Sequence, residues 1–332
     1  DPRERIRVGG AMTSAKVWSE GLSGIRQLLK RHPLPARLGV LTYFEILTFL
    51  AIRIFAKAGV QVGIFEIGLG GRLDATNVLK APLVILTRIH LDHEAFLGRT
   101  VAKIAAEKAA IIKSRGQVVI GEQFPEALRV IKKAVRRNRG MLWKASPVRG
   151  VPLGLVGDFQ RLNAGVALKA AEVLSERFGF AFNRELSLQG LRSRNWKGRM
   201  ELFRRGERLF ILDGAHNPIS VKALVRSLQK DFGTKKDAWL VFGAMNDKNS
   251  REMLRIFRRF FSKVILTGVS GSRAKSIPAL LREANALFSC VLTAASVAEA
   301  LRILKKIRGH ERAVVSGSFY LVGEARRILK HG

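Results

Sequence analysis

A single carboxylate stands between an apolar run and a glycine-rich loop near residue 66. The run at 60–67 predicts a buried parallel strand, with Glu66 near its carboxyl end. Gly68, Gly70 and Gly71 follow, and glycines let a backbone approach a ligand closely. A lone carboxylate at this edge of an open α/β sheet is placed to hold Mg²⁺ beside phosphates. A tight turn uses the same glycines, so the loop alone leaves both interpretations open.

A lysine lies on the apolar face of a helix predicted over 101–112, which Thr100 can cap. The stripe, at spacings of three and four, consists of Val101, Ile104, Ala105, Lys108 and Ile112. Burial of an ammonium is costly and lowers its pKa. Lys108 either sits in the apolar face as a perturbed amine or snorkels to the rim of the core.

Two more polar groups follow predicted strands. His93 comes after the strand predicted at 83–89, so it is a metal-ligand candidate, although an isolated histidine also serves structure. Asp92 can orient His93 or cap the next turn, and we favour the structural role. Asp213 ends the strand predicted at 209–212, where it can contact a nucleotide or cap the helix that begins near Pro218.

Composition narrows the class of protein. The 332 residues are 47% hydrophobic, which fits two globular domains, and the single cysteine, Cys290, excludes an intrachain disulfide and fits a reducing cytoplasm. No secretory signal pattern occurs in the charged first residues. The net charge of +33 divides into +17 for 1–196 and +16 for 197–332, so it is spread evenly. We interpret it as solvated basic surface that attracts polyanions such as ATP, without a specific nucleic-acid site.

Alternating strand and helix patterns predict an α/β fold with a parallel sheet in each part. In the first part we expect helix 43–58, strand 60–67, strand 83–89, helix 101–112, strand 118–121, helix 125–138 and helix 160–178. The periodicity lapses at 192–196, where we place a linker. The second part predicts a Rossmann-like domain of about five strands. Its strands are expected at 209–212, 239–242, 264–267, 290–293 and 313–316, and its helices at 220–230, 251–261, 278–286, 297–307 and 321–329.

Motifs in order along nearly the whole chain resemble the folylpolyglutamate synthase and dihydrofolate synthase family, a branch of the Mur-type ATP-dependent ligases. The longest is the thirteen-residue string at 65–77, Phe-Glu-Ile-Gly-Leu-Gly-Gly-Arg-Leu-Asp-Ala-Thr-Asn. Shorter ones are Leu-Thr-Tyr-Phe-Glu at 41–45, Leu-Asp-His at 91–93, Glu-Lys-Ala at 107–109, Trp-Lys-Gly-Arg at 196–199, Asp-Gly-Ala-His-Asn-Pro at 213–218, Asp-Lys at 247–248 and Gly-Ser-Phe-Tyr-Leu-Val-Gly-Glu at 317–324.

The resemblance implies roles for the candidate residues. It implies a magnesium site of Glu66, His93 and Lys108, in which the lysine is carbamylated, with His93, Lys108 and Arg199 as catalytic residues. It implies ATP contacts from Asn163, Arg199, Asp213 and His216, and a folate or pterin pocket lined by Thr42, Phe44, Leu73, Asp74 and Ala75. For this pocket the residues alone leave core packing of Phe44 and a turn role of Asp74 open. ATP and Mg²⁺ are the implied cofactors, and K⁺ is a further candidate.

The sequence departs from the family at the phosphate loop. The family begins with a strand, a Gly-Lys-Ser/Thr loop and a helix, whereas no Gly-x-x-x-x-Gly-Lys-[Ser/Thr] motif occurs in this sequence. We therefore expect residues 1–196 to be an incomplete, N-terminally truncated phosphate-loop-type domain that binds ATP and folate. Residues 197–332 are expected to form the Rossmann-like glutamate ligase domain. A relative that has truly lost the loop, with a non-catalytic role, stays open.

The leading hypothesis is a cytoplasmic, monomeric ATP-dependent ligase that joins L-glutamate to a folate carboxylate through an acyl phosphate. The acceptor is tetrahydrofolate, dihydropteroate or both. One alternative is another Mur-type amino-acid ligase, and Phe44 with the Leu73–Asp74–Ala75 motif favours folate over it. The other is a non-catalytic basic binding protein derived from this fold.

Overall fold

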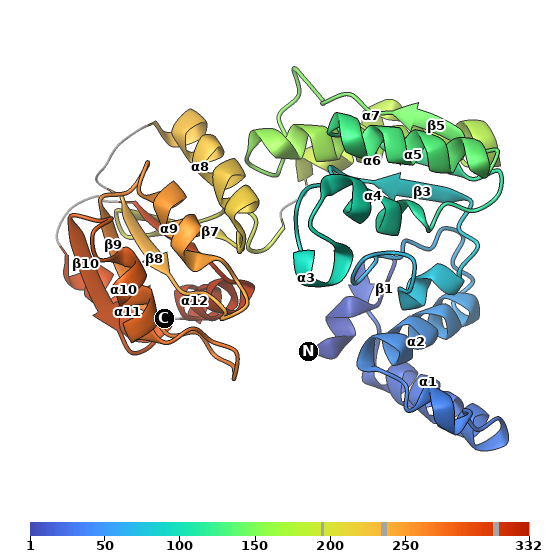
Figure 1. Cartoon of the computed structure of the whole chain (residues 1–332), viewed down its shortest axis with the longest axis horizontal. Helices are drawn as coiled ribbons and strands as arrows, with labels where there is room; N and C mark the ends of the chain where they lie inside the picture. Colours follow the sequence, from blue (N-terminus) through green and yellow to red (C-terminus); the bar gives the residue numbers. More distant parts are fainter. Residues whose placement is uncertain (194–195, 234–237, 308–311, 332) are drawn as a thin grey trace. The chain divides into compact units, whose positions relative to one another are not determined.

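The computed structural model describes residues 1–193, 196–233, 238–307 and 312–331, which form two compact units, Asp1–Trp143 and Lys144–Gly332. Each unit has its own sheet and its own apolar core, so each is described by itself (Figure 1). Part of the predicted linker, residues 194 and 195, lies outside the described residues. No helix among the described residues has the length and apolar character needed to cross a membrane.

The first unit opens with a short 3-10 turn, a small hairpin and a pair of helices. The elements are η1 (Pro2–Arg5), β1 (Arg7–Val8), β2 (Ala11–Met12), α1 (Ala15–Arg31), η2 (Ala36–Leu38) and α2 (Tyr43–Lys57). Helix α2 begins at a capping box in which Thr42 and Glu45 satisfy each other's backbone N–H groups. Its apolar face, including Leu50, packs against Trp18 and Ile25 of α1. This helix presents Phe44 in its first turn.

A three-stranded sheet with two covering helices forms the core of the first unit. The elements are η3 (Ala75–Val78), β3 (Leu83–Leu86), α3 (Glu94–Leu97), α4 (Val101–Ala109), β4 (Gln117–Ile120), α5 (Pro125–Arg137) and β5 (Met141–Lys144), with sheet order β3-β4-β5. Strands β3 and β4 are parallel, and one face of the sheet is covered by α4 and α5. Thr100 caps α4 as predicted, because its hydroxyl accepts from Lys103 N at 3.2 Å. Burial of Ile104 and Ala105 fixes the rotation of α4.

The prediction of a strand at 60–67 is wrong. This segment belongs to no strand formed by the described residues, and Glu66 and Ile64 are exposed, Ile64 by 85%. The apolar residues of this segment favour a strand, but a strand also needs hydrogen bonds to a neighbouring strand. Strand β3 pairs with β4, and no ladder to 60–67 is described.

The second unit begins with two helices that make a small apolar cluster. They are α6 (Asp158–Phe178) and α7 (Arg184–Ser193), and their cluster centres on Val148, Ala164 and Leu168. Gly165 has no room for a side chain, because a Cβ there would lie 1.9 Å from the Ser146 carbonyl oxygen. The chain segment before α6 is therefore held tightly against the helix.

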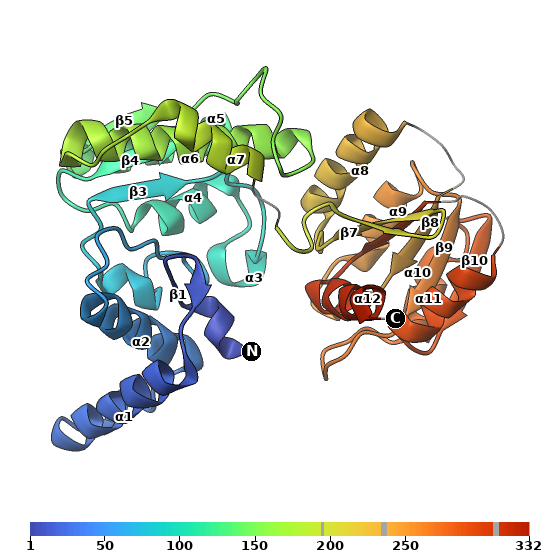
Figure 2. The ribbon, with the colours of Figure 1, turned by 180° about the vertical axis from the view of Figure 1, so that it is seen from behind.

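The rest of the second unit is a six-stranded sheet between two helical layers (Figures 1 and 2). Its elements are β6 (Glu201–Arg205), β7 (Arg208–Asp213), α8 (Pro218–Phe232), β8 (Trp239–Phe242), α9 (Ser250–Phe257), β9 (Lys263–Thr267), α10 (Ile277–Ala284), β10 (Cys290–Ala294), α11 (Val297–Lys306), β11 (Ala313–Ser316) and α12 (Phe319–His331). The strand order is β10-β9-β8-β11-β7-β6, with the first five parallel. Alternate strand residues point to α8, α9 and α10 on one face and to α11 and α12 on the other.

This sheet confirms the prediction of a Rossmann-like domain of about five strands. All five predicted strands occur, and β8 and β11 have the predicted bounds. The antiparallel edge strand β6, which pairs with β7, was not predicted. Its sequence, Glu-Leu-Phe-Arg-Arg, is too short and too charged to stand out as a strand. The mixed α/β class with parallel sheets is confirmed.

Candidate functional site

The glycine loop of the first unit packs against two helices. A Cβ on Gly68 would lie 3.1 Å from the Phe44 ring at the start of α2. A Cβ on Gly71 would lie 2.5 Å from the Glu107 carbonyl oxygen and 3.1 Å from Lys108 Cα in α4. The loop thus brings the regions of Phe44 and Lys108 together, which the sequence motifs predicted only as separate strings.

Asp74 holds the loop in shape. Its Oδ2 accepts from the backbone N–H groups of Gly68 at 2.9 Å and Leu69 at 3.2 Å, while Oδ1 accepts from Thr76 N and Oγ1. These contacts make Asp74 the cap of η3 and give it the turn role that the sequence left open. A contact between Asp74 and a pterin ring stays a prediction.

Lys108 is half-buried on α4, beside the buried Ile104 and Ala105. Burial lowers the pKa of the Lys108 ammonium, and the nearby Asp92 and Asp74 carboxylates oppose that shift. The apolar-stripe placement therefore has its expected electrostatic effect. An amine with a lowered pKa is more readily neutral, and a neutral amine is the form that adds CO₂ to become a carbamate.

His93 lies next to Asp92 at the start of α3. Its backbone is left-handed, with φ of 49°, and its N–H donates to Asp92 Oδ1 at 2.9 Å. The imidazole Nε2 is 3.9 Å from the same Asp92 oxygen. Asp92 thus contacts the backbone of His93 and also influences the pKa of Lys108, so it links the two candidate ligands.

Glu66 is exposed and has no described side-chain partner. Among the described residues, no group of three His, Cys, Asp or Glu side chains is clustered tightly enough to hold a metal ion. A magnesium site at Glu66, His93 and Lys108 therefore needs the carbamate oxygens of Lys108, since Mg²⁺ prefers oxygen ligands. The metal set stays a prediction.

The remaining predicted folate residues differ in exposure. Thr42 is occupied in the capping box with Glu45, and Phe44 is half-buried beside Gly68. Leu73 is 94% exposed, and Ala75 is half-buried at the start of η3. Phe44 and Asp74 lie at the same glycine loop, whereas no described contact joins Leu73 to them.

In the second unit, Asp213 is a buried carboxylate at the carboxyl end of β7. It is 4% exposed, and its oxygens accept from Met200 N and Ala215 N, each at 2.9 Å. Burial raises the pKa of Asp213, while the two backbone hydrogen bonds and the charge of Arg199 act against that rise. The residue that caps α8 is Asn217 and not Asp213, because the Asn217 side chain accepts from Ser220 N. The capping interpretation of Asp213 is therefore wrong.

Arg199 and His216 meet at the ring of Phe319. The Arg199 guanidinium lies 4.8 Å above the ring centre, and the His216 ring lies 5.5 Å from it at a tilted angle. His216 Nδ1 is 2.9 Å from the Gly214 carbonyl oxygen, and Gly214 N donates to Gly198 O. The structure thus brings Arg199, Asp213 and His216 together. Phe319 was not predicted as a site residue, although it stands in the motif at 317–324.

Asn163 lies on α6. Its side chain is exposed, and Nδ2 donates to Gln160 Oε1 at 3.0 Å. No described contact joins Asn163 to Arg199, Asp213 or His216. Its predicted role stays a prediction.

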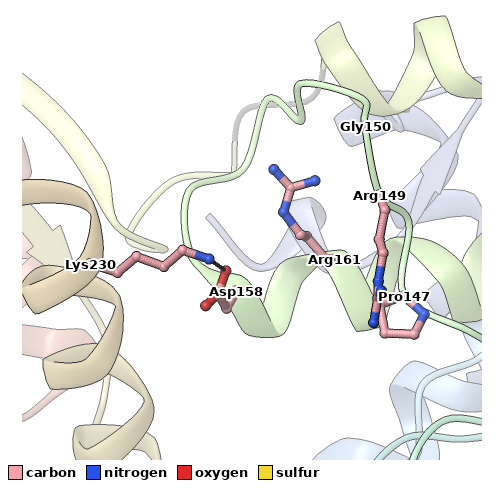
Figure 3. Close-up of a pocket in the computed structure, with 6 residues that line it drawn as sticks. All are labelled: Pro147, Arg149, Gly150, Asp158, Arg161 and Lys230. Atoms are coloured by element: carbon pink, nitrogen blue, oxygen red, sulfur yellow. Dashed lines mark hydrogen bonds and ion pairs between the residues drawn. The ribbon is translucent and has the colours of Figure 1, made fainter.

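A shallow pocket in the second unit lies near the start of α6 (Figure 3). It is lined by Pro147, Arg149, Gly150, Asp158, Arg161 and Lys230. Lys230 pairs with Asp158 at 2.6 Å, and Arg161 donates to the carbonyl oxygens of Val148 and Val151. The pocket contains none of the predicted site residues. Two of its cations already have partners: Lys230 pairs with Asp158, and Arg161 donates to the two carbonyl oxygens.

Comparisons with known proteins match both parts of the chain. The family model for the Mur ligase glutamate ligase domain matches residues 198–319. The dihydrofolate synthase/folylpolyglutamate synthase of Bacillus subtilis is 30% identical over 353 residues, covering 98% of this chain and 81% of that protein. The folylpolyglutamate synthase of Lacticaseibacillus casei is 30% identical over 318 residues, covering 88% and 72%.

Solved structures give the same result. The folylpolyglutamate synthase of Mycobacterium tuberculosis complexed with ADP superposes with a TM-score of 0.87 at 27% identity, covering 100% of this chain and 82% of that chain. FolC of E. coli in complex with DHPP and ADP superposes with a TM-score of 0.85 at 26% identity, covering 99% and 79%.

The sheet of the second unit and its Asp213–His216 loop are those of a Mur-type ligase domain, by the match at 198–319. The matches with whole enzymes cover both parts of the chain, and they identify one family within the Mur-type ligases. This chain belongs to the folylpolyglutamate synthase and dihydrofolate synthase family.

Proposed function

We propose that this chain is an ATP-dependent carbon–nitrogen ligase that joins L-glutamate to the carboxylate of a folate. The observation that carries the proposal is the 30% identity to a dihydrofolate synthase/folylpolyglutamate synthase over 98% of the chain. In the proposed reaction, ATP phosphorylates the folate carboxylate and the glutamate amine attacks the acyl phosphate, releasing phosphate. Another Mur-type amino-acid ligase has less support, because the relatives reported above are named for folate substrates.

The proposed ATP contacts are Asn163, Arg199, Asp213 and His216. Two relatives were solved with ADP, which supports a nucleotide site in this fold. Arg199 is half-buried and is not paired through a described salt bridge, so its guanidinium is placed to stabilise phosphate charge. Asp213 has both carboxylate oxygens engaged by backbone N–H groups. We therefore propose that Asp213 shapes the loop and holds Arg199 electrostatically.

The proposed magnesium ligands are Glu66, His93 and carbamylated Lys108. Magnesium supplies positive charge that screens the phosphates during transfer. The lowered pKa of Lys108 supports carbamate formation at this position, and Asp92 supports the placement of His93. K⁺ is retained as a second proposed ion.

The proposed acceptor pocket is lined by Thr42, Phe44, Leu73, Asp74 and Ala75. Contact between the Phe44 ring and Gly68 supports a flat aromatic surface beside the glycine loop, suited to stacking on a heterocycle. Tetrahydrofolate and dihydropteroate both carry a pterin ring, in different reduction states, so both are tested as acceptors.

The organisation proposed for the chain has a central domain at 1–196 and a glutamate ligase domain at 197–332. The start of the matched range at residue 198 supports this boundary, which differs from the division of the compact units after Trp143. A cytoplasmic, monomeric enzyme is part of the same proposal.

The reaction is tested by omission. Purified protein is incubated with ATP, Mg²⁺, L-glutamate and a folate acceptor, and each component is left out in turn while phosphate and glutamylated product are measured. Because the sequence contains no Gly-x-x-x-x-Gly-Lys-[Ser/Thr] motif, the chain is assayed both alone and joined to a strand–loop–helix segment that carries one. Product that requires all four components supports the proposal. A folded fusion protein that yields no glutamylated product with either acceptor contradicts it.

A further inference from the structure

Phe319 occupies the centre of the Arg199–His216 group. Its ring is 4.8 Å from the Arg199 guanidinium and 5.5 Å from the centre of the His216 ring. A cation above an aromatic face is attracted by the negative charge of that face, and the attraction orients the guanidinium. Phe319 is 44% exposed, whereas Leu321 and Val322 in the same turn of α12 are buried. The core of the unit therefore relies on Leu321 and Val322 more than on Phe319.

The turn that leads to Phe319 is anchored on the Asp213–His216 loop. Gly317 N donates to the Ala215 carbonyl oxygen at 3.0 Å, and Ser316 Oγ donates to the same oxygen at 3.3 Å. Gly317 has φ of +119°, and a Cβ there would lie 2.6 Å from the Gly243 carbonyl oxygen. Only glycine combines this backbone conformation with this close approach. The position of Phe319 is therefore fixed by the loop that carries His216.

Gly214 gives the Phe319 ring its place. A Cβ on Gly214 would lie 2.2, 2.4 and 2.7 Å from three ring atoms of Phe319, so the ring rests directly on the backbone there. Gly214 N also donates to Gly198 O at 2.9 Å, which ties the turn before Arg199 to the same backbone. Three separate segments, at 198–199, 214–216 and 317–319, thus converge on one aromatic ring.

We propose that Phe319 is a positioning residue for nucleotide phosphate binding, because its ring holds the Arg199 guanidinium and the His216 imidazole in one fixed arrangement. The proposal rests on the proposed function, in which Arg199 and His216 contact ATP. A long arginine side chain loses rotamer freedom when it binds phosphate. The ring removes part of that freedom beforehand, so binding costs less than it would with a free side chain.

The experiment measures ADP affinity by isothermal titration calorimetry for the full chain joined to the strand–loop–helix segment that carries the phosphate-loop motif, and for its variants. Phe319→Leu keeps an apolar side chain and removes the aromatic face, and Phe319→Tyr keeps the face. We expect Phe319→Leu to weaken ADP binding by about two- to fivefold. Phe319→Tyr should retain the wild-type affinity. Tyr320→Leu, at the neighbouring exposed position, is the matched control and should leave the affinity unchanged.

A double-mutant cycle with Arg199→Ala separates positioning from a structural effect. If Phe319 acts through Arg199, then Phe319→Leu has little further effect on ADP affinity once Arg199 is alanine. Equal losses in both backgrounds overturn the proposal, as does wild-type affinity in Phe319→Leu. If Arg199→Ala itself leaves ADP affinity unchanged, the proposed nucleotide site has failed.

A measurement made without nucleotide distinguishes failure of the Phe319 proposal from failure of the proposed nucleotide site. The chain has six histidines, and the Phe319 ring should shift the NMR resonances of His216 through its ring current. Phe319→Leu should move the His216 Cε1–H signal, which His216→Gln identifies by its loss. If the fusion that carries the phosphate-loop motif and the unsubstituted chain binds no ADP, the nucleotide site fails, and an unmoved His216 signal then overturns the Phe319 arrangement as well.

Discussion

Gly71 lies directly against the backbone of the helix that carries Lys108. A Cβ at Gly71 would stand 2.5 Å from the Glu107 carbonyl oxygen and 3.1 Å from Lys108 Cα. Neither neighbour is the end of a flexible side chain, so neither can move aside without shifting the loop or α4. The glycine at this point of the motif is required by close backbone approach, and that approach fixes the loop relative to Lys108.

Gly71→Ala should therefore destabilise the first unit. We expect a loss of about 1–3 kcal/mol in the free energy of unfolding, the usual cost of overpacking. Urea denaturation followed by circular dichroism measures it. Gly190→Ala is the matched control, because Gly190 lies in α7 with open space at its Cβ position, and alanine there should be neutral or stabilising. An unchanged stability for Gly71→Ala contradicts the close approach.

Asp213 predicts a dependence of stability on pH. Burial raises its folded-state pKa above the ordinary value of 3.8, so the folded protein holds this proton more tightly than the unfolded chain does. Stability gained from protonating Asp213 is complete below 3.8 and is lost as pH rises through the raised pKa. The stability of wild type relative to Asp213→Asn should thus increase as pH falls from 7 towards 4. Asp231→Asn, at an exposed position of α8, is the control for other titrating groups. A relative stability that is flat with pH contradicts the raised pKa.

Glu201 and Arg326 form a salt bridge whose carboxylate is 6% exposed. Glu201 accepts from Arg326 Nε at 2.9 and 3.0 Å and from Gly198 N at 2.8 Å. Arg326→Met should destabilise the second unit by about 3 kcal/mol, because it leaves a buried charge without its partner. Replacing both residues with apolar ones should cost less than Arg326→Met alone. Thermal and urea unfolding measure both effects, and the exposed pair Lys57–Glu20 serves as the control through Lys57→Met.

Lys108 predicts a chemical rescue. In the form of the protein that shows ligase activity, Lys108→Ala should lower turnover by about two orders of magnitude, comparable to the loss of one group that stabilises transition-state charge. Acetate should restore part of the rate, because its carboxylate can replace the carbamate. Lys103→Ala, on the exposed face of the same helix, is the control. Experimental density that shows an unmodified lysine pointing into solvent, with no metal nearby, contradicts the carbamate assignment.

Because the 332-residue sequence contains no phosphate-loop motif, we expect a large difference in ligase activity between the chain alone and the chain joined to a segment that carries the motif. The loop provides backbone N–H groups and a lysine for the β- and γ-phosphates, so a chain without it should bind ATP weakly and turn over negligibly. We expect the 332-residue chain alone to show negligible ligase activity. Joining it to a strand–loop–helix segment that carries the motif should restore activity. Full ATP-dependent glutamylation by the chain alone contradicts the expectation.

The two sheets were predictable to different degrees. In the second unit, β8 and β11 were predicted to the residue, because buried parallel strands are continuous apolar runs such as Trp-Leu-Val-Phe and Ala-Val-Val-Ser. The same reasoning failed at 60–67, where the apolar residues are interrupted by Gln61, Gly63 and Glu66 and the described residues form no strand. Composition indicates which side chains of a segment tend to be buried, whereas a strand forms only where a neighbouring strand can share hydrogen bonds with it.

The residues of the candidate site were predictable from sequence motifs, but their arrangement in space was not. The family motifs supplied Arg199, Asp213 and His216, and the structure brings all three to one sheet edge. No periodicity in the sequence indicates that Phe319, 120 positions after Arg199, lies between them. The parallel pairing of β11 with β7 sets Ser316 beside Asp213, so the segments that follow the two strands, which carry Phe319 and His216, lie close together.

The unpaired apolar segment at 60–67 bears on how the protein behaves in solution. Its exposed side chains, Ile64 above all, can meet the same segment of another molecule, while the net charge of +33 keeps molecules apart at low ionic strength. Salt shortens the reach of that repulsion to about 8 Å at 0.15 M and leaves apolar attraction intact. The colloidal stability of this chain should thus fall as salt rises, so dilute buffer, and not high salt, is the medium that keeps its molecules separate.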